Sequence, residues 1–361
     1  MTGKDTLMSE ARSQSETELR SDRSAPDHLS SSPQVVCIGD VVIDFTASGV
    51  SDAGNPIYEC NAGGSPANVA AAVAALDGQS AFLGCVGEDD FGDLLRTSLM
   101  EAGVDVRGLV TTTEAGTRLV FIELAEDNER HFKRYPWPAA ERCLRAADLD
   151  LDLLDHCKAL HVSMGALREQ PIREATWEAI ARVRRREVPV SFDSNWTQEI
   201  SVDPIRERRF LLDTGAEMDI RKLSLNELEF LFPGATIEEA TDALFDSGPR
   251  LVIVTAGAQG CPYRSAAGSG FVPAFPVQAL DTTGTGDTFL GALLYQLTRA
   301  DTVDLDAVCG DAMYDALCFA SAAGAVGATR RGSLRVMPSM ADVMCMLERP
   351  ETRQPANGDH A

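Results

Sequence analysis

Hydrophobic and polar positions divide the chain into three parts. Residues 1–33 mix Ser, Asp, Glu and Arg with few large apolar side chains, so they bury too little surface to offset the entropy of ordering. We expect a disordered, acidic, Ser-rich tail there and a flexible C-terminal tail at 349–361. Between them, over residues 34–348, short β-rich apolar runs alternate with helical patterns. That alternation predicts an α/β domain in which helices cover a mainly parallel sheet.

Six short apolar runs predict buried strands, and five segments of helical spacing predict helices between them. The expected strands are Val35–Ile38, Ala81–Val86, Ala159–Ser163, Val188–Phe192, Lys222–Leu225 and Leu251–Thr255. The expected helices are Ala67–Leu76, Phe91–Glu101, Ile172–Arg185, Leu228–Phe232 and Thr288–Leu297. Residues 41–58 and 117–135 break this rhythm, because they are extended and partly alternating. Their strands are expected to form a small separate sheet, which is either a lid over a cleft or an ordinary β excursion.

Composition excludes several classes of protein. The net charge of −23 disfavours nucleic-acid binding, which needs clustered Lys and Arg. No apolar run approaches the roughly 20 residues that cross a bilayer, and the chain does not start with an apolar signal. Nine scattered cysteines without a Cys-x-x-Cys pair predict reduced thiols, with no disulfide framework or zinc site. We therefore expect a cytoplasmic protein that binds neither nucleic acid nor membrane; its acid excess indicates either adaptation to high salt or an ordinary acidic surface.

The most informative motif is Asp281-Thr-Thr-Gly-Thr-Gly-Asp287, which precedes a helical stripe of apolar residues. Gly284, Thr285 and Gly286 therefore fall in the turn that opens a helix. Unpaired N–H groups and the helix dipole suit such a turn to a phosphate or a migrating phosphoryl group. Asp287 has two interpretations: an acid stabilised by the helix dipole, or a base that takes the proton of an attacking hydroxyl.

A second motif, Ala62-Gly63-Gly64-Ser65-Pro66-Ala67-Asn68, opens a helix rich in Ala and Val. Its small residues let a polyol approach the backbone, and Asn68 can donate to and accept from hydroxyl groups. Asp44 is polar among apolar neighbours and would need a partner if buried, for which a sugar hydroxyl would serve. The competing interpretations are a helix cap with close packing for the motif and a backbone turn for Asp44.

Two further polar turns follow strand candidates. Thr255-Ala-Gly257-Ala-Gln-Gly260 is a glycine-rich turn at a carboxyl strand end, where α/β folds bind ligands. Asn226 and Glu229 follow another strand and either help to hold hydrated Mg²⁺ and phosphates or cap a helix. The sequence contains neither the P-loop signature nor the Gly-x-Gly-x-x-Gly of dinucleotide-binding proteins.

Taken in order, these motifs resemble those of the PfkB carbohydrate kinase family over about residues 35–347. The pairing of Gly63-Gly64 through Asn68 with Asp281 through Asp287 carries the resemblance. It implies a ribokinase-like αβα sandwich with a small β lid. It also implies an ATP-dependent kinase that acts on a small-molecule sugar.

The resemblance implies a role for each motif residue. Asp287 would be the catalytic base, and the anion hole would be formed by Gly284, Thr285 and Gly286. The residues implied to bind the sugar are Asp44, Gly63, Gly64 and Asn68. Those implied to meet ATP are Asn226, Thr255, Gly257, Gly260 and Ser321, with Glu229 acting on Mg²⁺ through water. Family members often use a monovalent cation such as K⁺, and the matching positions are Asp281, Thr283, Arg330 and Gly332.

Within the family, the chain looks most like fructokinases, which implies fructose 6-phosphate as the product. It departs from them where Thr197 ends the segment Asp193-Ser-Asn195-Trp196-Thr197 in place of an Arg, and where Pro136 replaces another Arg. Thr285 and Ser321 stand where Ala and Asn are usual. The acceptors 2-keto-3-deoxygluconate, ribose or another pentose therefore stay open, as does, after them, a nucleoside. So do a catalytically silent regulatory or binding protein, a nucleotide-binding protein without a sugar site, and a homodimer formed through the lid.

Overall fold

The main sheet of the computed structural model has nine strands. The structure describes residues 32–124, 130–134, 139–197, 203–308, 310–332 and 334–349. The strand order is β13 (Gly268–Val272), β12 (Cys261–Ser265), β11 (Leu251–Thr255), β10 (Ile220–Ser224), β9 (Val190–Asp193), β8 (Ala159–Ser163), β1 (Val35–Ile38), β4 (Ser80–Gly87) and β5 (Leu109–Thr112). The strands from β11 to β5 are parallel, and β12 and β13 add an antiparallel edge. Their carboxyl ends therefore meet at one edge of the sheet.

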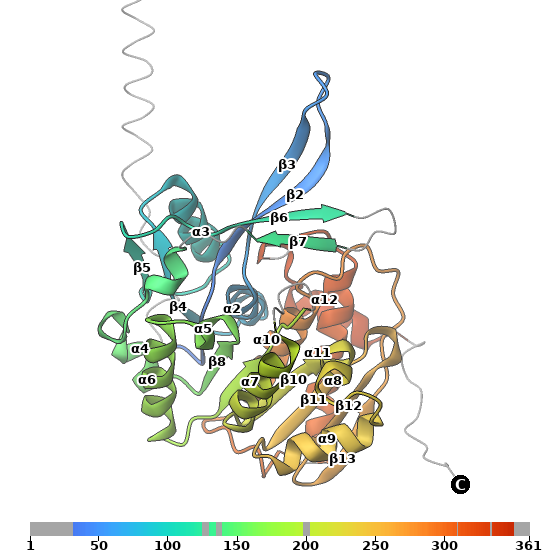
Figure 1. Cartoon of the computed structure of the whole chain (residues 1–361). Coiled ribbons are helices and arrows are strands. Elements are labelled where there is room, and N and C mark those ends of the chain that lie inside the picture. Colours follow the sequence, from blue (N-terminus) through green and yellow to red (C-terminus); the bar gives the residue numbers. More distant parts are fainter. Residues whose placement is uncertain are drawn as a thin grey trace, which may run out of the picture. The chain divides into compact units, whose positions relative to one another are not determined.

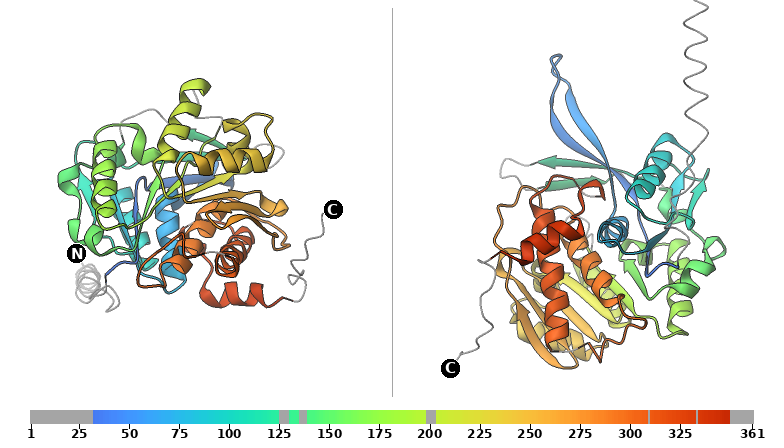
Figure 2. Two further views of the ribbon diagram at one scale, coloured as in Figure 1. Left: turned by 90° about the horizontal axis from the view of Figure 1, so that it is seen from below. Right: turned by 180° about the vertical axis from the view of Figure 1, so that it is seen from behind.

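Helices cover both faces of this sheet, so that two apolar layers are buried. On one face lie α2 (Ser65–Ala75), α3 (Asp90–Glu101), α10 (Thr285–Leu297), α11 (Asp311–Ala328) and α12 (Met340–Leu347). On the other lie α4 (Leu151–His156), α5 (Gly165–Arg168), α6 (Ile172–Arg184), α7 (Pro204–Ala216), α8 (Leu225–Leu231) and α9 (Ile237–Asp246). Short 3₁₀ helices are η2 (Ala140–Cys143), η3 (Ala146–Asp148), η5 (Gly257–Gln259) and η6 (Leu334–Val336). Figure 2 shows the orange and red helices α10 to α12 in front of the sheet when the molecule is seen from behind.

A second sheet stands apart from the first and has four strands. Its order is β3 (Pro56–Gly63), β2 (Val42–Val50), β6 (Leu119–Leu124) and β7 (Arg130–Arg134). The β2 and β3 strands pair antiparallel and project as a long hairpin (Figure 1). The predicted fold class is confirmed: an αβα sandwich with a mainly parallel central sheet and a small additional sheet.

The expected strands and helices all form, with ends that shift by up to three residues. Sequence reasoning missed α7, α9, α12 and the β12–β13 hairpin, and it missed the 18-residue α11. The α11 sequence consists largely of Ala, Gly and other small residues, so no polar stripe marks its period. The predicted tails fall almost wholly on residues 1–31 and 350–361, outside the described residues, and stay predictions. Within the described part of the chain, no helix is both long and apolar enough to span a bilayer.

Candidate active site

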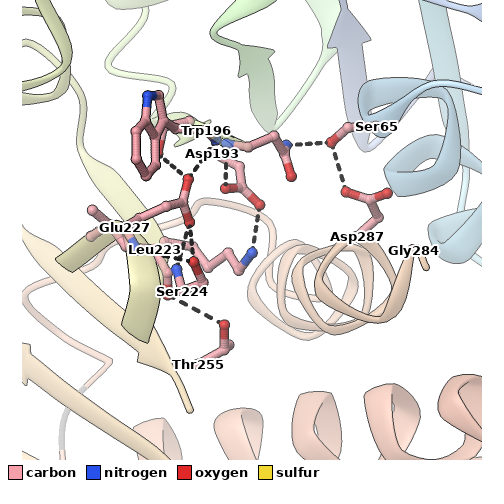
Figure 3. A network of polar contacts seen from close by, with 12 residues as sticks. Ser65, Asp193, Trp196, Leu223, Ser224, Glu227, Thr255, Gly284 and Asp287 are labelled. Carbon is pink, nitrogen blue, oxygen red and sulfur yellow. Dashed lines mark hydrogen bonds and ion pairs between the residues drawn. The ribbon is translucent and has the colours of Figure 1, made fainter. Parts of the chain in front are cut away.

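Two helix N-termini meet at the carboxyl edge of the parallel sheet. The α2 and α10 helices begin at Ser65 and Thr285 and pack against each other. Across this contact, Ser65 Oγ donates to Asp287 Oδ1 at 2.6 Å (Figure 3), and Asn68 Nδ2 donates to Asp287 Oδ2 at 2.9 Å. The fold thus joins two glycine-rich motifs at one carboxylate, although Ser65 and Asp287 are 222 residues apart in sequence.

The start of α2 requires a glycine. Gly64 has φ 108°, and a Cβ on it would lie 2.6 Å from the carbonyl oxygen of Asp40. Pro66 follows in the first turn, where its fixed φ and missing N–H are tolerated. Asn68 lies inside the helix and is buried, and its amide points to Asp287 rather than capping the helix. Its Oδ1 is also buried and has no hydrogen-bond partner among the described residues.

The start of α10 presents free backbone donors. Gly284 is the N-cap residue with φ 70°, and the N–H of Thr285 bonds the carbonyl oxygen of Thr282 at 3.2 Å. In the described part of the chain, the N–H groups of Gly286 and Asp287 have no acceptor. With the helix dipole behind them, these two amides can bind an anion. The Thr285 hydroxyl is buried there, likewise without a described partner.

The Asp287 carboxyl is buried and electrostatically tuned. Burial raises its pKa to about 6, while the hydrogen bonds from Ser65 and Asn68 lower it. The charge of Asp193 also raises this pKa, and the charge of Lys222 lowers it. A carboxyl with such a pKa is ionised at neutral pH and can still accept a proton readily. Because the side chain bonds α2 rather than its own helix, stabilisation by the helix dipole alone does not account for it.

A buried ion pair lies beside this site, and sequence reasoning missed it. Lys222 Nζ donates to Asp193 Oδ2 at 2.8 Å, and the two side chains are 5% and 0% exposed. Burial lowers the pKa of Lys222, but Asp193 and Glu227 more than offset this, so the pKa lies above its ordinary value. A Cβ on Gly286 would lie 2.6 Å from Lys222 Nζ, so the ammonium group occupies the space beside the α10 turn. Asp193 ends β9 and Lys222 lies inside β10, where the two are register partners, so no signal local to the sequence joins them.

Glu227 holds the loop that follows β9, and sequence reasoning missed it too. Its carboxylate accepts four hydrogen bonds, from Ser194 Oγ at 2.6 Å, Trp196 N at 2.8 Å, Ser224 N at 2.6 Å and Ser224 Oγ at 2.8 Å (Figure 3). Asn195 lies within the same loop, and its Nδ2 donates to Ser65 Oγ at 2.6 Å. Glu227 is therefore linked through Asn195 and Ser65 to the Asp287 carboxylate. The signal was the Ser-x-x-Glu capping box that opens α8.

Asn226 and Glu229 do not cap α8, since Ser224 and Glu227 do so. Both side chains are exposed in the first turns of the helix, and Glu229 Oε1 accepts from the N–H of Gly234 at 3.1 Å. No cluster of three His, Cys, Asp or Glu side chains that would hold a metal occurs among the described residues. Isolated oxygen ligands of this kind fit Mg²⁺, which keeps several waters and is bound together with substrate phosphates.

The other predicted nucleotide residues lie at the end of β11, in the turn that follows it and on α11. Thr255 ends β11, and its hydroxyl donates to the Leu223 carbonyl at 3.3 Å. Gly257 and Gly260, with φ 54° and 94°, form the turn that leads into β12. Ser321 is half-buried on α11.

The predicted sugar residues lie on the second sheet and at its junction with α2. Asp44 is half-buried on β2 and stands opposite Asn61 of β3, and Gly63 is paired with Val42 at the end of the hairpin. Tyr135 and Pro136 are outside the described residues.

The predicted cation residues are joined by Asp281. Its Oδ1 accepts from the N–H of Thr283 at 2.8 Å, and its Oδ2 accepts from the N–H of Gly332 at 3.3 Å. This ties the turn before α10 to the segment after α11. Arg330 belongs to that segment, but its guanidinium turns away to an ion pair with Asp342 at 2.9 Å. A buried carboxylate between two turns rich in carbonyl oxygens fits a monovalent cation.

Comparison with known proteins gives concordant matches. The sequence model described as pfkB family carbohydrate kinase matches residues 32–340. The probable fructokinase-3 of Arabidopsis thaliana is 36% identical over 323 residues, covering 89% of this chain and 93% of that protein. A solved fructokinase with bound ATP from Xylella fastidiosa is 31% identical, with a TM-score of 0.80 over 87% of this chain and 98% of that one.

The fructokinase of Vibrio cholerae O395 is a third relative, solved twice with fructose and ADP bound. The form that also holds calcium has a TM-score of 0.76, and a double mutant that holds potassium has 0.75. Each is 33% identical and covers 88% of this chain, with 99% and 100% of the solved chain matched.

Proposed function

We propose that this chain, which belongs to the pfkB family of carbohydrate kinases, transfers the γ-phosphoryl group of ATP to the primary hydroxyl of fructose, giving fructose 6-phosphate. One observation carries the proposal. A buried carboxylate, Asp287, lies in the same helix turn as two unpaired amides. Base and anion site are thereby held within one rigid element.

In the proposed reaction, Asp287 accepts the proton of the sugar hydroxyl as its oxygen bonds the γ-phosphorus. The bond from that phosphorus to the bridging oxygen of ADP breaks, and its electron pair stays on ADP. The N–H groups of Gly286 and Asp287, with the turn at Gly284 and Thr285, stabilise the charge on the migrating group. Ser65 and Asn68 orient the carboxylate until the sugar arrives.

The nucleotide and its ions would bind at the carboxyl edge of the sheet, beyond β10 and β11. Asn226, the turn from Thr255 to Gly260, and Ser321 would hold ATP, and Glu229 would hold Mg²⁺ through water. Mg²⁺ would neutralise phosphate charge and orient the phosphates. The Asp281, Thr283, Arg330 and Gly332 region would hold a monovalent cation. Potassium in the Vibrio cholerae relative supports that last assignment.

The sugar would bind between the two sheets. Asp44, Gly63, Gly64 and Asn68 would contact its hydroxyls, and the second sheet would exclude water, which otherwise competes as acceptor. The similarity to fructokinases, one of them solved twice with fructose bound, supports fructose as acceptor. The absent Arg residues at Thr197 and Pro136 make the acceptor the part of the proposal that most needs a direct test.

The second sheet would also carry a homodimer. Its β3 is an edge strand, and Val50 and Ile57 of the hairpin are 69% and 45% exposed. Covering an exposed, partly apolar edge is a common reason for pairing. Light scattering should give the mass of two chains, and Ile57→Lys should give a single chain.

The acceptor and the base are tested by a coupled assay of ADP release over fructose, ribose, 2-keto-3-deoxygluconate and adenosine. We expect preference for fructose, and we expect Asp287→Ala to lower kcat roughly 10³-fold while ATP and sugar still bind. Asp155→Ala is the control, because it removes a carboxylate from a surface ion pair with Arg182. A preference for another sugar would mean that fructose is not the acceptor. Turnover of Asp287→Ala at the wild-type rate would mean that Asp287 is not the base.

A further inference from the structure

The Lys222–Asp193 pair is the most deeply buried ion pair among the described residues. Each ion loses its hydration, and such pairs are often replaced by apolar side chains at no cost in stability. Their presence on the neighbouring strands β9 and β10, beside the α10 turn, therefore calls for a chemical reason.

Lys222 also has hydrogen-bonding capacity that the protein does not use. An ammonium group has three N–H donors. Asp193 accepts one of them, and no other described residue accepts from Lys222 Nζ. The remaining donors belong to a 5% exposed side chain, so bulk water has little access to them.

Unused donors alone do not mark a ligand site, as the neighbouring residue shows. Arg221 is fully buried on the opposite face of β10, donates to the carbonyl of Leu211, and has two nitrogens without a described partner. What distinguishes Lys222 is its position. Its ammonium lies beside Gly286, whose unpaired N–H belongs to the anion-binding turn.

We propose that Lys222 is a further catalytic residue, whose ammonium donates hydrogen bonds to the phosphoryl group as it moves from ADP to the sugar. The inference rests on the proposed phosphoryl transfer. Lys222 keeps all its protons throughout, while Asp287 receives the hydroxyl proton and ADP keeps the electrons of the broken bond. Asp193 is a positioning residue, because it holds the ammonium charged and directs it toward the turn.

The decisive experiment separates this role from that of a structural ion pair. Lys222→Met alone leaves Asp193 buried without its ion-pair partner. A loss of turnover could then result either from lower stability or from the missing ammonium group. The double variant Asp193→Asn/Lys222→Met removes both charges together. We expect it to melt close to the wild-type Tm and to bind ATP with a Kd within about threefold of wild type. Its kcat should stay roughly 100-fold or more below wild type, as when one donor to a developing anion is removed. Recovery of wild-type kcat would overturn the proposal.

A measurement on the wild-type protein keeps the proposal testable if the double variant does not fold. The chain has four lysines, Lys4, Lys133, Lys158 and Lys222, so a spectrum of ¹⁵N-lysine ammonium groups resolves each. Lys→Arg variants of the other three assign the fourth signal. On adding sugar, ADP and aluminium fluoride, which mimics the migrating phosphoryl group, the Lys222 signal should shift. An unchanged signal in a protein that binds these ligands would contradict the contact.

Arg221→Met is the matched control, since it removes a buried cation from the next position of the same strand but on the opposite face. We expect its kcat to stay within about twofold of wild type. These experiments also distinguish the role of Lys222 from the proposed function on which it rests. If wild type released no ADP with any sugar, the proposed function would fail. If wild type turned over, Asp287→Ala did not, and the double variant was fully active, only the role of Lys222 would fail.

Discussion

The two faces of the central sheet bury comparable apolar layers but treat polar side chains differently. In strands β8 to β10, buried His161, Ser191, Asp193 and Lys222 lie on the face toward α10, whereas Arg221 is the one buried charged side chain of these three strands on the face toward α7. On the α10 face, polarity rises toward the carboxyl edge and ends beside Asp287. Within these strands, one face therefore carries mainly apolar side chains that pack against helices. The other face combines such packing with buried polar and charged groups that act on Asp287.

Among the variants that test this comparison, we expect the largest loss of turnover when one methyl group is added on the α10 face. Gly286→Ala would place a Cβ 2.6 Å from Lys222 Nζ, so either the ammonium or the helix turn must move. We expect kcat to fall roughly 100-fold, as expected when an oriented donor is lost.

The control for this change is Gly324→Ala. A Cβ there meets its nearest neighbour at 3.5 Å, an ordinary contact, and Ala favours the helix. Wild-type kcat in Gly286→Ala, measured in the ADP-release assay, would show that the space beside Lys222 is not needed.

The pH dependence of turnover also tests the α10 face, because burial and charged groups on that face shift the pKa of Asp287. Burial raises that pKa to about 6, and the proposed base would accept a proton only when ionised. kcat/KM should therefore rise with pH through about 6 and be about tenfold below its plateau at pH 5.

Lys222 and Asp193 should move this profile in opposite directions. The charge of Lys222 lowers the pKa of Asp287 and that of Asp193 raises it. Asp193→Asn should thus shift the acid limb to lower pH. A limb that stays in place would mean that the pair does not act on the base.

A smaller effect is expected from the loop that supports Asn195. Glu227→Gln keeps the side-chain volume but puts an amide where the carboxylate accepts four hydrogen bonds. The loop should loosen, and kcat should fall about tenfold through the link from Asn195 to Ser65.

The informative readout for Glu227→Gln is the division between kcat and KM. A rise in KM for ATP alone, with kcat kept, would place Glu227 on the nucleotide side rather than behind the base.

The smallest effect on turnover should come from the opposite face. Leu244 is fully buried there on α9, and Leu244→Ala creates a cavity. We expect it to lower the free energy of unfolding by about 2–5 kcal/mol while kcat at 25 °C stays near wild type. Denaturant titration and the ADP-release assay together check this. A large loss of kcat in a folded Leu244→Ala protein would mean that the two faces are not independent.

The sequence predicted the parts of the site that depend on local order. Gly284, Gly286 and Asp287 occupy one helix start, so their spacing alone places them together. The Asp193–Lys222 pair could not be predicted in this way, because it depends on β9 and β10 being neighbours in the sheet. Glu227 was not predicted alongside Asn226 and Glu229, although Ser224 and Glu227 have the spacing of a capping box. The α11 helix could not be predicted, because its many small residues, which pack against α10, leave no polar stripe with helical spacing.

The separation of 222 residues between Ser65 and Asp287 has a consequence for synthesis. A ribosome makes Ser65, at the start of α2, 222 residues before Asp287. A nascent polypeptide that has not reached α10 therefore cannot form the contact between Ser65 and Asp287. Two separately expressed fragments, divided between α9 and α10, would each be inert and would regain turnover only on reassembly.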